Sequence, residues 1–226
     1  NGTYPLVSAA AAGQVASACR VANPAVGKAY SFAAANGLVS VTVADAAALS
    51  AWNAPAGGAW TEPGNWTGGA PTSAGAQATF GVSAAVDVDA DVTVGSLLID
   101  GAESLALGGA GTLTLANGGA AALVEARTGS HAISAGLTLQ GGAVLKAAAG
   151  AALTLSGEIR AAPGAAALLE IRGAGTVSVA GDCHVPILVA DTATLCMAEG
   201  ARIMAGVTVA AGAALRIDGT AELAGT

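Results

Sequence analysis

A short pattern of alternating residues recurs along this chain from about Val92 to Leu223. In each copy two aliphatic residues flank one small or polar residue, and glycine and alanine separate successive copies. A period of two places the flanking residues on one face of a strand and the middle residue on the other. The copies are Val92-Thr93-Val94, Leu105-Ala106-Leu107, Leu113-Thr114-Leu115, Leu137-Thr138-Leu139, Leu153-Thr154-Leu155, Val177-Ser178-Val179, Val207-Thr208-Val209 and Leu215-Arg216-Ile217.

The spacing of these copies predicts a solenoid. Intervals of about 8 and about 24 residues recur, which correspond to one side and to one full turn of a three-sided coil. Strands that follow one another without a helical pattern stack into coils, because each coil alone cannot bury its apolar face. The sequence therefore predicts an all-β fold, a right-handed parallel β-helix, with about six coils over residues 84–226.

Composition limits the partners of the protein. Of 226 residues, 54% are hydrophobic but only 3% are aromatic and 10% charged, so alanine and other small residues dominate. No stretch approaches the roughly 20 consecutive apolar residues of a membrane-spanning helix. The net charge is −7 and the eight basic residues are scattered, whereas a nucleic-acid surface needs clustered Lys and Arg. We expect no membrane span and no nucleic-acid partner.

The first zone, residues 1–50, is expected to form a small β meander. The dipeptide Asn36-Gly37 lies between two apolar runs and is a strong signal for a tight hairpin turn. Short strands are expected at residues 3–7, 15–21, 29–33 and 38–43.

The second zone, residues 51–83, holds all three tryptophans, Trp52, Trp60 and Trp66, and ends near Phe80. Its many prolines and glycines exclude a continuous strand, so the large rings must fold over apolar surface. The open first coil of the solenoid, which begins the third zone at residue 84, supplies such a surface. We expect these four aromatic residues to be structural and this zone to cap the solenoid.

Three cysteines, Cys19, Cys183 and Cys196, give an odd count. The last two are between half a coil and one coil apart, so they form a candidate disulfide that leaves Cys19 free or paired with another chain. The alternative is three buried thiols that act as small apolar residues.

Alternating acidic residues Asp87, Asp89 and Asp91 form a candidate calcium site, since a strand would place all three carboxylates on one face. The alternative is a solvated outer face that discourages edge pairing. Asp182, Cys183 and His184 also place a carboxylate, a thiol and an imidazole in sequence. Neighbouring residues of a strand point to opposite faces, however, so we expect no catalytic role there. His131 is expected at the surface or at a corner.

Polysaccharide-cleaving enzymes also use β-helices, but their sites gather acidic and basic side chains with aromatic platforms. Here the acidic residues beyond residue 100 stand mostly alone, and no aromatic residue follows Phe80. We therefore expect no enzyme, no catalytic residues and no cofactor.

The tryptophan-bearing zone resembles a known family. The order Trp52-Asn53, Trp60, Asn65-Trp66, Gly68-Gly69, Pro71, Gly75, Ala78 and Phe80, followed by Val-rich strands, looks like the opening of an autotransporter-associated β-strand repeat protein. This group comprises bacterial surface and secreted passengers, and the resemblance covers about residues 52–98. It implies a parallel β-helix, an extracellular or cell-surface location and a scaffold role, and it offers no catalytic residues. Since the chain begins at Asn1 without a leader pattern, we expect a mature or excised segment.

The strand pattern continues through residues 213–223 without a cap. An uncapped coil exposes backbone groups and apolar interior, which favours a further coil or a partner. We expect either a longer solenoid or a non-catalytic structural protein that assembles head to tail into a filament or layer, with residues 1–50 covering the open end of a neighbour. The alternative is an adhesin-type passenger module that binds host glycan or matrix.

Overall fold

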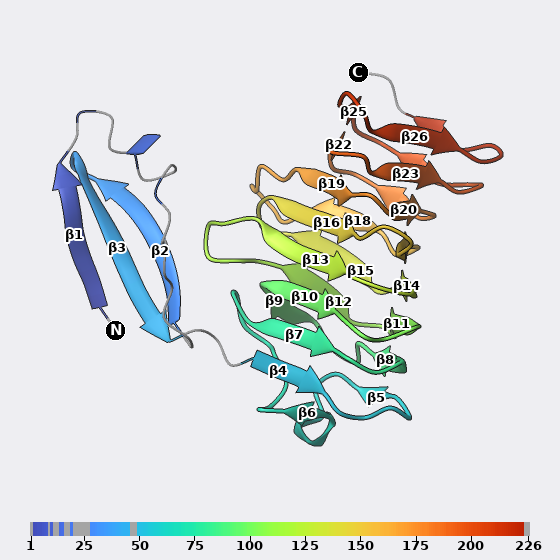
Figure 1. The fold of residues 1–226 in the computed structure, drawn as a ribbon, viewed down its shortest axis with the longest axis horizontal. Helices are drawn as coiled ribbons and strands as arrows, with labels where there is room; N and C mark the ends of the chain where they lie inside the picture. The colour runs from blue at the N-terminus through green and yellow to red at the C-terminus, as the bar shows by residue number, and fades with distance from the viewer. Residues whose placement is uncertain are drawn as a thin grey trace. The chain divides into compact units, whose positions relative to one another are not determined.

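The computed structural model describes residues 2–8, 10, 14, 15, 19, 28–45 and 49–223. The chain divides into two compact units, Asn1–Ala48 and Leu49–Thr226, and each is described by itself (Figure 1).

The N-terminal unit is built on a three-stranded antiparallel sheet of β1 (Gly2–Ser8), β2 (Lys28–Ala35) and β3 (Leu38–Asp45), with β3 in the middle. The β2–β3 turn is the predicted one, and the left-handed φ values of Asn36 and Gly37, 51° and 72°, suit a tight hairpin. The order differs from a simple meander because β1 pairs with β3 instead of β2. The strand predicted over residues 15–21 is wrong at the two described residues, because Val15 is helical and Cys19 is not in a strand. The rest of that segment lies outside the described residues.

The second unit is a β-solenoid of about seven turns over the described residues, whose strands stack in three sheets (Figure 1). Neighbouring strands run parallel, except that β6 is antiparallel to β4. Sheet 1 contains, in spatial order, β25 (Val207–Val209), β22 (Ile187–Val189), β19 (Leu169–Gly173), β16 (Ala143–Ala147), β13 (Ala122–Ala126), β10 (Ser96–Ile99), β7 (Gln77–Phe80), β4 (Leu49–Trp52) and β6 (Trp66–Thr67). Sheet 2 contains β26 (Ala214–Ile217), β23 (Thr194–Met197), β20 (Thr176–Val179), β17 (Ala152–Leu155), β14 (Ser130–Ile133), β11 (Leu105–Gly108), β8 (Ala84–Asp87) and β5 (Gly58–Ala59). Sheet 3 contains β27 (Glu222–Leu223), β24 (Arg202–Ile203), β21 (Asp182–Cys183), β18 (Ile159–Ala161), β15 (Gly136–Leu139), β12 (Thr112–Leu115) and β9 (Val92–Val94).

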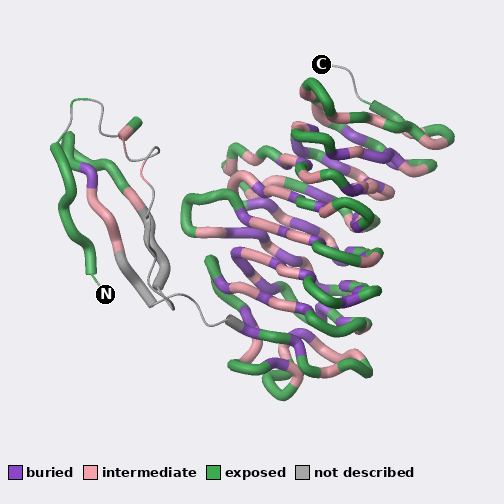
Figure 2. Tube along the Cα trace, viewed as in Figure 1, coloured by how far each residue is buried: buried purple, intermediate pink, exposed green. Residues whose placement is uncertain are grey.

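The predicted alternation sets the interior. Leu113 and Leu115 of β12 are buried, and their register partners on β15, Leu137 and Leu139, are buried as well. Aliphatic side chains thus stack in columns along the axis, and buried and less buried residues alternate along strands such as β12 and β15 (Figure 2). The predicted all-β, parallel-coil architecture is confirmed.

Coil length is less regular than the recurring sequence interval suggests. Ser96 pairs with Gln77 in the preceding coil and with Leu123 in the following one, so the second of these two coils is the longer. The strands need only keep their register, and the corners therefore absorb insertions such as the loop around Asn117. The sheets also begin earlier than residue 84, because the tryptophan-bearing zone itself contributes β5, β6 and β7.

The last described coil is open. Val209, Ile217 and Leu223 continue the three interior columns, one in each sheet, yet they are 41%, 47% and 43% exposed. Their register partners one coil earlier, Val189, Met197 and Ile203, are fully buried. Among the described residues, this coil therefore presents an apolar surface and three strand edges without a partner.

Candidate functional site

The four predicted structural aromatic residues form one cluster inside the first coil. Trp66 lies between Trp52 and Trp60, at ring-centroid distances of 5.0 and 4.8 Å, and both contacts are edge-to-face. Phe80 of β7 packs against all three rings, and all four side chains are buried. Each edge-to-face pair adds about 0.5–1.5 kcal/mol beyond simple burial. The cluster fills the interior where the first coil has no coil beneath it.

Each indole N–H in this cluster has a backbone acceptor. Nε1 of Trp60 donates to the carbonyl of Pro71 at 3.0 Å, and Nε1 of Trp66 donates to the carbonyl of Trp60 at 2.7 Å. Nε1 of Trp52 donates to the carbonyl of Ala54 at 2.7 Å. These bonds tie the irregular residues 53–75 over the rings, which explains how a Pro- and Gly-rich stretch keeps one conformation.

The candidate calcium site does not form. Strand β8 ends at Asp87, so Asp89 lies beyond the strand and Asp91 follows the bend at Ala90. Asp89 accepts hydrogen bonds from the hydroxyl and the backbone N–H of Thr61, and Asp91 accepts one from the N–H of Thr112 at 2.8 Å. The hydroxyl of Thr61 lowers the pKa of Asp89 below its ordinary value. These two carboxylates connect coils, and no group of three or more His, Cys, Asp or Glu side chains in the described part of the chain could hold a metal ion.

The predicted Cys183–Cys196 disulfide is wrong, because both are free thiols in the structure. Cys183 lies on sheet 3 with its side chain inside the solenoid. Cys196 lies on sheet 2 at an outward position, where its Sγ lies 3.1 Å from Oδ2 of Asp218 and 3.4 Å from Nη2 of Arg216. The thiol of Cys183 therefore lies inside the solenoid, and that of Cys196 lies on the outer face of another sheet.

The thiol of Cys183 faces the interior, whereas the side chains of Asp182 and His184 face outward. Burial raises the pKa of the Cys183 thiol, which keeps it protonated, while the exposed His184 ring points outward to Glu158 at 3.3 Å. Asp182 forms an ion pair with Arg202, and the hydrogen bond from Arg202 lowers the pKa of Asp182.

His131 was expected at the surface or a corner, and the structure corrects this expectation. The residue lies within β14, faces the interior and is buried. Its Nδ1 accepts a hydrogen bond from the backbone N–H of Leu105 at 3.1 Å, and Nε2 contacts the carbonyl of Thr128. The imidazole therefore completes backbone pairing where β11 and β14 have not yet begun their regular ladder.

Ion pairs occupy the outward face of sheet 1. Arg127 binds Asp100 at 2.7 Å, and Lys146 binds Glu125 at 2.9 Å, each between neighbouring coils. The hydrogen bond that Arg127 donates to Asp100 raises the pKa of Arg127. These exposed pairs hold the orientation of their side chains but add little to the free energy of unfolding, since a surface pair contributes about 0–1 kcal/mol.

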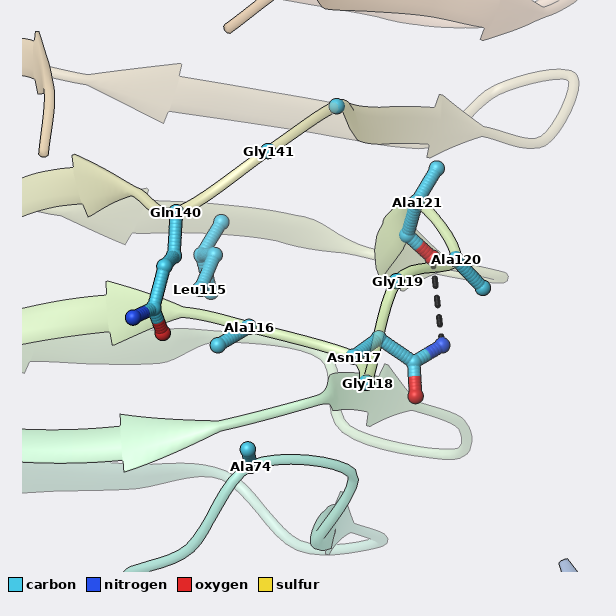
Figure 3. Close-up of a pocket in the computed structure, with 11 residues that line it drawn as sticks. Ala74, Leu115, Ala116, Asn117, Gly118, Gly119, Ala120, Ala121, Gln140 and Gly141 are labelled. Atoms are coloured by element: carbon cyan, nitrogen blue, oxygen red, sulfur yellow. Dashed lines mark hydrogen bonds between the residues drawn. The ribbon is translucent and has the colours of Figure 1, made fainter. Parts of the chain in front are cut away.

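A hollow of about 260 Å³ lies between the loops that follow β12 and β15 (Figure 3). Glycine and alanine form most of its wall, and the amides of Asn117 and Gln140 are its polar side chains. The Asn117 amide donates to the carbonyl of Ala121 at 3.1 Å, which holds the loop in place. This hollow contains no titratable side chain.

A second hollow, of about 350 Å³, lies on the outward face of sheet 3. Three threonines from β12 and β15 line it together with Arg160 and Ala161 of β18, and Asp91 and Pro163 complete its wall. The sequence named Thr114 and Thr138 only as the middle residues of two copies of the recurring pattern, and of the residues lining this hollow only Asp91 was a candidate site residue.

No family model, curated protein or solved structure matches this chain. The resemblance of the tryptophan-bearing zone to autotransporter-associated repeats therefore stays a prediction. No helix in the described residues is long and apolar enough to cross a membrane.

Proposed function

We propose that this protein is a non-catalytic structural protein, a stiff β-solenoid rod that assembles head to tail. The observation that carries the proposal is the exposure of Val209, Ile217 and Leu223 in the last described coil, while their partners one coil earlier are buried. Covering this surface would remove apolar area from water and pair three strand edges at once.

The N-terminal unit of a second copy is the proposed occupant. Its strand β1 carries Tyr4 and Leu6, two residues apart and each 50% exposed. A unit as small as Asn1–Ala48 buries a smaller share of its surface than a larger domain does, so docking onto an apolar coil would stabilise it. Because the two surfaces differ, the contact is heterologous, and such a contact propagates into a filament unless a rotation closes it.

The test is to follow particle length by negative-stain electron microscopy and mass by light scattering over roughly a hundredfold range of protein concentration. Rods that lengthen with concentration are expected. Ile217→Glu and Leu6→Glu, each on one side of the proposed contact, should leave monomers. Leu168→Glu is the matched control, since Leu168 is 41% exposed and lies on neither surface.

Two results would contradict the proposal. One is a monomer at every concentration, which would mean that further coils of the same solenoid cover the last described coil instead of a second copy. The other is assembly that persists in both Ile217→Glu and Leu6→Glu, or that is lost to the same extent in the control Leu168→Glu. Circular dichroism of each variant separates lost assembly from lost folding.

We also propose a location at the bacterial cell surface or in the extracellular space. The support is the resemblance of residues 52–98 to exported passengers. Protease treatment of intact cells tests it: digestion of the protein without lysis is expected, and full protection would contradict it.

A further inference from the structure

The hollow on the outward face of sheet 3 has a regular floor. Thr114 of β12, Thr138 of β15 and Arg160 of β18 are register partners on three successive strands. They form a row along the solenoid axis with a spacing of about 4.8 Å per coil. Among the described residues, the hydroxyls of Thr114 and Thr138 have no hydrogen-bond partner, so both can donate to and accept from a ligand.

A glycine lies on the same face of β15 as Thr138. Gly136 occupies the outward position next to Thr112, its register partner. A Cβ built on Gly136 would lie 3.9 Å from the side chain of Thr112 and from the carbonyl of Glu158, with nothing closer. A side chain at this position would therefore fit without a clash against the backbone and would lie beside Thr112, which lines the hollow.

Arg160 differs from the other arginines in the described residues. Arg127, Arg172, Arg202 and Arg216 each donate a hydrogen bond to a carboxylate. Arg160 instead has its nearest carboxylate oxygen, that of Glu158, at 3.5 Å, and its side chain is 53% exposed. Glu158 is shared with His184 at 3.3 Å. The guanidinium of Arg160 thus keeps donors available for a planar anion.

We propose that this hollow binds an acidic polysaccharide, with a sugar carboxylate on Arg160 and sugar hydroxyls on Thr114 and Thr138. A chain that offers many hydroxyls and one carboxylate per sugar matches a row of hydroxyls that ends in one guanidinium. The carboxylate of Asp91, which also lines the hollow, can accept from a further sugar hydroxyl. The volume of about 350 Å³ lies within the range of small-ligand sites.

The negative net charge of the protein favours an anionic ligand of low charge density over one of high charge density. A net charge of −7 repels a densely charged polyanion such as a nucleic acid. A uronic-acid polymer has lower charge density and can place one carboxylate on Arg160 while neutral groups contact the threonines. The site does not depend on the proposed head-to-tail assembly, because Thr138 and Arg160 lie in the middle of the solenoid and not on its final coil.

The experiment is calorimetric titration of the whole chain with an oligomannuronate of defined length, in the presence of a chelator so that no divalent cation bridges the partners. We expect saturable binding, and at least about tenfold weaker binding of a neutral maltooligosaccharide of equal length. Arg160→Gln should weaken oligomannuronate binding by roughly tenfold or more, because it removes a charge-assisted pair of hydrogen bonds. Thr138→Val should weaken binding because it removes one of the hydroxyls, and Gly136→Val should weaken it by adding a side chain beside Thr112.

Arg172→Gln is the matched control, since it removes an exposed guanidinium on sheet 1 and should leave the affinity unchanged. Thermal melts of every variant verify folding. The proposal is overturned if the wild type does not bind oligomannuronate, if the neutral oligosaccharide binds equally well, or if Arg160→Gln and Arg172→Gln have the same effect. Light scattering of the same samples reads the assembly state separately, so failure here is distinguishable from failure of head-to-tail assembly.

Discussion

Nδ1 of His131 accepts a hydrogen bond from the backbone N–H of Leu105 in the neighbouring coil, 3.1 Å away. Since Nδ1 is the acceptor, Nε2 carries the proton and donates to the carbonyl of Thr128. One buried side chain thus satisfies a backbone donor and a backbone acceptor inside the wall of the solenoid. A histidine in this interior is a structural bridge between coils.

Replacing this bridge should destabilise the solenoid strongly. His131→Ala leaves the N–H of Leu105 and the carbonyl of Thr128 unpaired and opens a cavity, so we expect a loss of about 2–4 kcal/mol. Urea unfolding followed by circular dichroism measures it. His184→Ala is the control, because its ring is exposed, and we expect it to change stability by less than about 0.5 kcal/mol. Equal losses for the two variants would show that the bridge contributes nothing.

The aromatic cluster should govern the stability of the first coil. Trp60 is fully buried, contacts Trp66 and Phe80, and donates to the carbonyl of Pro71. Trp60→Ala is therefore expected to cost about 3–5 kcal/mol.

Because coils of a solenoid interact mainly with their neighbours, this loss should be local. Hydrogen exchange should show faster exchange in β7 than in β20, which lies several coils away. Tyr4→Ala, an exposed aromatic of the N-terminal unit, serves as control. Uniformly faster exchange along the whole solenoid would contradict a local role for the cluster.

The recurring pattern of two aliphatic residues around one small or polar residue predicted the coils well. A strand that buries one face has aliphatic residues at every second position, and this alternation is visible in the sequence. Leu113 and Leu115, with Thr114 between them, face inward and outward as the period of two requires. Very short strands such as β21 (Asp182–Cys183) were not predicted, because two residues contain no alternation. The interior position of His131 escaped for a related reason, because a polar residue on a buried face contradicts the pattern.

The hollow on sheet 3 could not be predicted from local sequence. The step along the chain from Thr114 to Thr138 is longer than the step from Thr138 to Arg160, so no fixed repeat aligns the three residues. Their contact depends on loops of unequal length at the corners, which the apolar pattern does not encode. Aligning the coils by their interior aliphatic residues would have placed these three side chains in one row.

Close approach of backbones between coils should make one glycine irreplaceable and another dispensable. Neither Gly157 nor Gly141 has a left-handed φ, so the available space decides. A Cβ on Gly157 would lie 2.2 Å from the carbonyl oxygen of Ala135, whereas nothing lies within 4 Å of one on Gly141. Gly157→Ala should therefore cost roughly 2–4 kcal/mol.

Gly141→Ala should be neutral or stabilise the protein by up to about 1 kcal/mol, because it reduces the entropy of the unfolded chain. Urea midpoints of the two variants test this pair. A tolerated Gly157→Ala would mean that the coils can separate at this corner without loss.

The Thr61–Asp89 contact should give the first coils an acid-sensitive component of stability. Hydrogen bonds from the hydroxyl and the N–H of Thr61 lower the pKa of Asp89 in the folded protein. A carboxylate whose pKa is lower when folded stabilises the protein above its unfolded pKa of about 3.9, and this stability is lost as the pH falls through the folded pKa.

Thr61→Val removes the hydroxyl donor, so the decline of stability with falling pH should become shallower. The urea midpoint, measured between roughly pH 6 and pH 3, reports the slope. Thr114→Val is the control, because its outward hydroxyl has no carboxylate partner among the described residues, and its slope should match that of the wild type. Since Asp89 is exposed, added salt should reduce the difference between Thr61→Val and the wild type. Parallel slopes for both variants at low salt would mean that Thr61 does not hold the charged form of Asp89.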